Sequence, residues 1–147
     1  MTLAERAIEP GVAEEWIREA LRIHPDGVRL TVSGTCMEPA LAAGSKVTLA
    51  PVTRAVRAGN VVLLRTPAGL RLHRVLLAFA DRIRTKGDLG TYLDPALPRS
   101  AVIAVCETGE GGFVMKFRAF RSLMKLLARP WTRGPDRGDQ AHARWLA

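Results

Sequence analysis

Cysteine, aromatic residues and long apolar runs are all scarce in this 147-residue chain. Two cysteines are too few for a disulfide scaffold or a cysteine-rich zinc module. No stretch of about 18 uncharged apolar residues is present to form a membrane-spanning helix, and the N-terminus lacks the basic and apolar regions of a secretory signal. We therefore expect a cytoplasmic protein with reduced thiols that uses neither a metal ion nor a cofactor.

Basic charge is concentrated towards the C-terminus. Lys and Arg outnumber Asp and Glu by eight to two in residues 113–147 and by ten to six in residues 33–112. Residues 1–32 instead contain four basic and six acidic residues. An excess of this kind is typical of proteins that bind nucleic acid or an anionic membrane. Because the basic residues show neither an aromatic stacking pattern nor a nucleic-acid motif, we expect no nucleic-acid partner.

The first 112 residues predict one mainly β domain with a short N-terminal helix. Residues 12–23 place apolar side chains at helical spacing, namely Ala13, Trp16, Ile17, Ala20 and Leu21. Six short segments rich in Val, Leu and Ile follow, at residues 28–32, 46–52, 60–66, 70–79, 82–85 and 101–107, with a hairpin turn predicted at residues 67–69. Strands at this density without long intervening helices indicate an antiparallel sandwich or partly open barrel.

Residues 113–131 predict a basic amphipathic helix. Its apolar face would carry Phe113, Phe117, Phe120, Met124, Leu127 and Trp131, beside an arc of Arg118, Arg121, Lys125 and Arg129. Such a helix either lies on an anionic membrane surface through residues 113–129, which would place the protein at the inner membrane, or packs on the domain or a partner. Residues 132–147 are polar and rich in turn formers, and we expect a flexible tail there.

The most informative motif is VSGTCMEPAL at residues 32–41. It resembles the nucleophile box V-x-G-x-S-M-x-P of the signal peptidase I and LexA-like peptidases, with Cys36 in place of the serine. Three further boxes follow in that family's order. Residues 59–62 resemble its G-D-V-V strand, residues 72–75 resemble the strand with the general base, and residues 85–88, with Asp94 beyond them, resemble the T-K-G-D box of the endoplasmic-reticulum type.

Cleavage of an amide bond requires a nucleophile, a base, a group that orients the base and donors for the oxyanion. Cys36 and His73 suit the first two roles, because a neighbouring imidazolium favours the reactive thiolate. His73 stands where bacterial members of the family have lysine, which favours a triad over a dyad. Asp94 is the preferred orienting acid and Asp88 the alternative.

Other residues of the motif have predicted roles beside the nucleophile. Gly34 would let the backbone approach a substrate carbonyl, and Met37 begins the segment that leaves the site. The oxyanion would be bound by the Cys36 N–H. In contrast, Cys106 lies in the apolar run AVIAVCE and is expected to be a buried core thiol.

The resemblance implies an endopeptidase that cleaves a leader, signal-like or precursor peptide. The alternative is a regulatory or binding module on the same fold that is non-catalytic or cleaves itself. One short helix before the strands is not enough for a helix-turn-helix, which disfavours a repressor.

Overall fold

The computed structural model describes residues 10–107, 118, 120–122 and 124 of the chain. Its elements are α1 (Pro10–Ile23), β1 (Val28–Thr31), β2 (Lys46–Ala50), β3 (Val61–Thr66), β4 (Gly69–Ala78), β5 (Arg82–Lys86), β6 (Leu97–Pro98), the 3-10 helix η1 (Arg99–Ala101) and β7 (Val102–Glu107). The predicted helix and all six predicted strands are present, each ending within two residues of its expected bounds. The two-residue strand β6 and the 3-10 helix η1 were not predicted.

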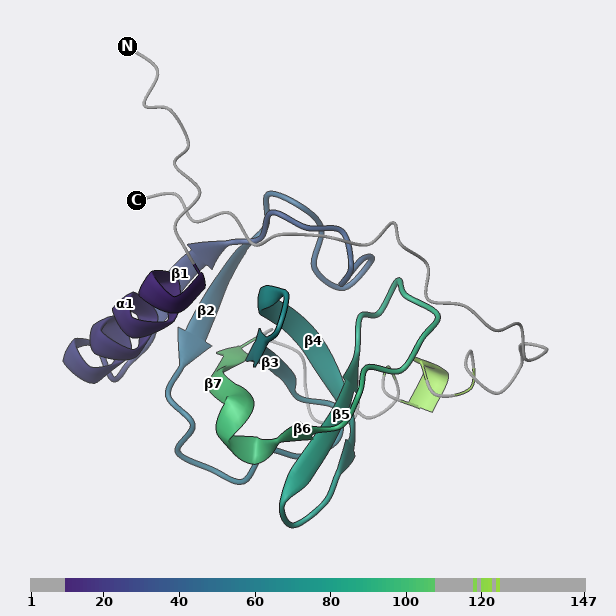
Figure 1. Ribbon diagram of the computed structural model, residues 1–147. Coiled ribbons are helices and arrows are strands. Elements are labelled where there is room, and N and C mark those ends of the chain that lie inside the picture. Colours follow the sequence, from purple (N-terminus) through teal and green to yellow (C-terminus); the bar gives the residue numbers. More distant parts are fainter. Residues whose placement is uncertain (1–9, 108–117, 119, 123, 125–147) are drawn as a thin grey trace.

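The strands form one open antiparallel sheet, which confirms the mainly β prediction (Figure 1). Their order is β1-β2-β7-β3-β4-β5-β6, so β1 and β6 are the outer strands. At the predicted hairpin, Thr66 pairs with Gly69 across Pro67 and Ala68. Gly69 has φ of 109°, a left-handed conformation that favours glycine. This tight turn sets the register of β4, which carries His73.

Hydrophobic residues cover both faces of the sheet. Val61 and Leu63 of β3 belong to one buried cluster, together with Ile17 of α1, whereas the alternating Val62 and Leu64 belong to a second cluster on the other face. The side chains of these four β3 residues are fully buried. The two faces therefore offer different surroundings to neighbouring residues of the central strands.

Helix α1 differs from its prediction in one respect. Ala13, Ile17 and Leu21 are buried as expected, but Trp16 is 60% exposed, so its assignment to the core face is wrong. Glu14 is buried instead and accepts a hydrogen bond of 2.9 Å from Arg18 Nε. The buried arc is centred on Ile17, and Trp16 lies about 100° from that centre on the helix.

The described residues near the C-terminus are Arg118, Phe120, Arg121, Ser122 and Met124, all helical. Ser122 is buried and accepts a hydrogen bond of 2.7 Å from Nζ of Lys86, the last residue of β5. Phe120 and Met124 are exposed. The other residues of the predicted helix 113–131 and the predicted tail 132–147 lie outside the described residues.

No helix within the described part of the chain is long and apolar enough to cross a membrane.

Candidate active site

Three of the predicted site residues come from separate elements and lie together, because His73 interacts with both Cys36 and Asp94. Cys36 lies in the loop after β1, His73 lies on β4, and Asp94 lies in the loop between β5 and β6. The two loops are joined directly, because the Leu89 N–H donates a hydrogen bond of 2.9 Å to the Cys36 carbonyl. The sheet therefore brings together residues that are up to 58 positions apart, as the numbers of Cys36 and Asp94 show.

Asp94 binds the His73 ring at Nδ1. The Nδ1 to Oδ2 distance is 2.5 Å, and the Thr85 hydroxyl donates to the same oxygen at 2.7 Å. The backbone of Asp94 is also held, because its N–H donates to the Thr85 carbonyl and its carbonyl accepts from the Arg84 guanidinium. With Nδ1 occupied, Nε2 is the ring nitrogen left for Cys36.

The electrostatics of this arrangement favour a charged imidazolium. Burial of the ring opposes protonation, but its interactions with Asp94 and Cys36 outweigh that effect and raise the pKa of His73 from 6.5 to about 9. Burial would also raise the pKa of the Asp94 carboxyl, but the hydrogen bond and charge of His73 keep it below its usual range. At neutral pH the ring is therefore largely a cation beside an aspartate anion.

The Cys36 thiol lies against a stretch of β4 that pairs with β3 on one side and has no strand partner within the described residues on the other. Its Sγ donates a long hydrogen bond of 3.7 Å to the Leu72 carbonyl. Among the described strands, β5 pairs with β4 only from Arg74 onwards, so this side of β4 is open before that residue. Cys36 is partly exposed at this opening.

Gly87 packs directly against the Cys36 backbone. A Cβ atom at position 87 would lie 2.7 Å from the Cys36 carbonyl oxygen, closer than Cβ atoms are found. Only glycine fits this contact without displacing the nucleophile loop. The sequence carried a signal for this residue, because Gly87 lies within the T-K-G-D box.

Asp88 is not at the site, so its assignment as the alternative orienting acid is wrong. Its two carboxylate oxygens accept hydrogen bonds of 2.9 and 2.8 Å from Arg74 Nε and Nη2. Arg74 is fully buried and also donates to the Gly59 carbonyl. His73 and Arg74 are adjacent on β4 and point to opposite faces, so each binds a different acid.

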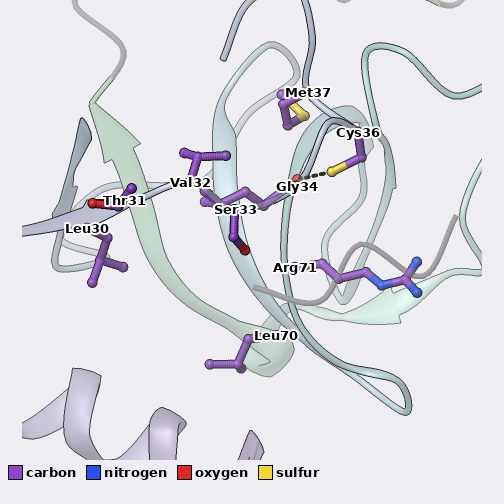
Figure 2. Close-up of a pocket in the computed structure, with 10 residues that line it drawn as sticks. Leu30, Thr31, Val32, Ser33, Gly34, Cys36, Met37, Leu70 and Arg71 are labelled. Atoms are coloured by element: carbon purple, nitrogen blue, oxygen red, sulfur yellow. Dashed lines mark hydrogen bonds between the residues drawn. The ribbon is translucent and has the colours of Figure 1, made fainter. Parts of the chain in front are cut away.

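An apolar pocket adjoins Cys36, and it contains both residues predicted to flank the nucleophile. Gly34 and Met37 line it and lie close to Cys36 (Figure 2). Met37 is fully buried and belongs to the hydrophobic core. The remaining wall is formed by residues of β1, the following loop and β4, namely Leu30, Thr31, Val32, Ser33, Leu70, Arg71 and Leu72. No motif points to Arg71, whereas Thr85 is the first residue of the T-K-G-D box, although no role was predicted for its hydroxyl.

The second cysteine has a different environment. Cys106 is 3% exposed, which confirms the prediction of a buried thiol, and both cysteines are free. Burial and the charge of Glu107 raise the pKa of Cys106 to about 12. A thiol of this kind stays protonated and unreactive at neutral pH.

Comparison with known proteins assigns no family to this arrangement. The chain matches no family model, and neither curated proteins nor solved structures give a significant match.

Proposed function

We propose that this protein is a peptidase in which Cys36 is the nucleophile, His73 the base and Asp94 the residue that orients the base. The observation that carries the proposal is the position of His73, which interacts with Cys36 and binds Asp94 through Nδ1. A nucleophile, an imidazole and a carboxylate in this order are the arrangement that activates cysteine for acyl transfer.

The chemistry follows from the charges. The Cys36 thiolate attacks the peptide carbonyl carbon, and the Cys36 N–H binds the oxyanion that forms. As the C–N bond breaks, His73 gives its Nε2 proton to the leaving amine and an acyl thioester remains on Cys36. A water molecule then gives a proton to His73 and attacks the thioester, which releases the acid and restores the ion pair. Asp94 holds the ring in the required orientation throughout.

The substrate would be an extended peptide lying beside the open stretch of β4. Backbone groups of an unpaired strand edge bind extended chains, and an apolar pocket at the same place takes a side chain. The pocket beside Cys36 is lined mostly by apolar residues, including Leu30, Leu70 and Leu72. The resemblance to signal peptidases adds the class of substrate, a leader, signal-like or precursor peptide with small apolar residues before the cut.

A test of the proposal is cleavage of a diverse peptide library, with products and enzyme adducts identified by mass spectrometry. We expect a thioester-linked peptide on Cys36, no cleavage by Cys36→Ala and a small residual rate for Cys36→Ser. Cys106→Ala is the matched control and should cleave at the wild-type rate. Cleavage by Cys36→Ala would reject the nucleophile, and absence of both cleavage and adduct would favour the non-catalytic module.

The helical residues near the C-terminus support a second proposal, contact with an anionic membrane surface. Phe120 and Met124 are exposed apolar side chains with the exposed Arg121 between them, whereas Ser122 faces the domain. Apolar side chains enter the lipid interface while arginine pairs with anionic headgroups. The double variant Phe120→Ser/Met124→Ser should bind phosphatidylserine vesicles more weakly at an unchanged melting temperature. Unchanged salt-sensitive vesicle binding would reject this role.

A further inference from the structure

Arg71 is the charged residue nearest in the strand to His73 on its own face of β4. The two are separated by one residue, and side chains two positions apart in a strand point to the same face. Arg71 also lines the pocket that contains Cys36. Figure 2 shows its guanidinium extending below Cys36, away from Leu30 and Leu70.

The guanidinium of Arg71 has no hydrogen bond or ion pair with any of the residues that the structure describes. Other arginines of this region are engaged: Arg74 binds Asp88, and Arg84 binds the Asp94 carbonyl. The charge of Arg71 acts on Asp94, but the Asp94 carboxylate is bound by His73 and Thr85. A cation that is free to bind a ligand therefore lies among the residues that line the apolar pocket beside Cys36.

We propose that Arg71 is a specificity residue that binds a carboxylate of the peptide substrate, supplied by an Asp or Glu side chain close to the cleaved bond. A guanidinium presents a planar fork of donors that matches a carboxylate, and a partly apolar surrounding strengthens the attraction. The inference rests on the proposed peptidase function. It means that the peptide substrate carries an acidic residue in addition to the apolar side chain that the pocket binds.

The first test needs no substrate, because two small alkylating agents of nearly the same size and shape differ in charge. Iodoacetate is an anion and iodoacetamide is neutral, and both modify the same sulfur. The measured quantity is the rate constant for iodoacetate at Cys36 divided by that for iodoacetamide. We expect this ratio to fall on the order of three- to tenfold in Arg71→Gln and to be largely retained in Arg71→Lys. Since His73 remains in every variant, its own attraction for the anion cancels in the comparison.

Arg65→Gln is the matched control, because Arg65 is an exposed arginine of β3 that lies near Glu14 rather than Cys36. Its ratio should equal that of the wild type. An unchanged ratio in Arg71→Gln, or an equal fall in Arg65→Gln, would overturn the inference. Slow iodoacetamide labelling of Cys36 in the wild type would instead count against the peptidase proposal, so the two failures are distinguishable.

The second test uses a peptide that the wild type cleaves. Replacing its acidic residue near the cut by the corresponding amide should raise KM several-fold for the wild type and leave Arg71→Gln unaffected. A peptide with an amidated C-terminus separates the two sources of carboxylate. If amidation, and not the side-chain change, raises KM, Arg71 binds a terminal carboxylate and the side-chain assignment is wrong.

Discussion

His73 and Arg74 are neighbours on β4, and each binds an aspartate from the segment that follows β5, yet the two pairs serve different purposes. The Arg74 guanidinium is fully buried and binds both oxygens of Asp88 and the Gly59 carbonyl. The His73 ring binds Asp94 on one side and meets Cys36 on the other. An ion pair that is enclosed on all sides stabilises a fold, whereas one with an open side next to a thiol can transfer a proton.

The largest expected effect is a loss of stability when the enclosed Arg74–Asp88 pair is broken. Arg74→Ala leaves the Asp88 carboxylate buried without its partner, and removing one member of a buried pair costs about 3–5 kcal/mol of unfolding free energy. Urea denaturation followed by circular dichroism measures this loss. The double variant Arg74→Met/Asp88→Leu should be less destabilised than Arg74→Ala. A loss below about 1 kcal/mol would mean that the pair does not stabilise the sheet.

Changes to the His73–Asp94 pair, which is open towards Cys36, should affect the rate of cleavage far more than the stability of the fold. His73→Ala is expected to lower kcat/KM about a thousandfold or more, because the residue that protonates the leaving amine and then takes a proton from water is lost. Adding Asp94→Asn to His73→Ala should cost little further, because the charge that Asp94 supports is already absent. Kinetics of the two single variants and the double variant on one peptide measure the coupling. Fully multiplicative losses would show that the two residues act independently.

Gly87 directly precedes Asp88 in the chain and packs against the Cys36 backbone, so its substitution tests the nucleophile loop. Gly87→Ala would push the Cys36 backbone away from its present position, so we expect at least a tenfold loss of Cys36 reactivity towards iodoacetamide. Gly90→Ala is the control, since a Cβ there makes an ordinary contact of 3.5 Å with the Gly87 carbonyl. Equal reactivity of the two variants would contradict the role given to Gly87.

A smaller effect is expected in the pH dependence of stability. The pKa of His73 is about 9 in the folded protein and 6.5 ordinarily, so the stabilisation from its charged form is complete below about pH 6.5 and is lost as the pH rises through about 9. The gap in melting temperature between wild type and Asp94→Asn should therefore be widest near about pH 6 and narrow towards about pH 10. Thermal denaturation at both pH values checks this, and a constant gap would contradict it.

Much of the fold was predictable because Gly, Pro and Asp separate the apolar segments along the sequence. Strand β6 was missed because its two residues, Leu97 and Pro98, give no alternating pattern. The choice between Asp88 and Asp94 could not be made from spacing. It depends on which face of the sheet each carboxylate reaches, and the Arg74–Asp88 pair that occupies one face forms only in three dimensions.

The site itself was predictable in its main members and not in its surroundings. Cys36, His73 and Asp94 came from the motif, and the structure places them together. Arg71 gave no signal, because its role arises from its place in the pocket wall, and although Thr85 is the first residue of the T-K-G-D box, its hydrogen bond to Asp94 forms only in the folded chain. The contact that a hydroxyl or guanidinium makes at a site cannot be read from the spacing of residues in the sequence.

The central claim, that His73 activates Cys36, is tested most directly by iodoacetamide labelling of the native protein at neutral pH with peptide mapping. We expect Cys36 to be alkylated at least tenfold faster than Cys106, and His73→Ala to remove most of this advantage. Faster modification of Cys106, or a Cys36 rate that His73→Ala leaves unchanged, would contradict this claim.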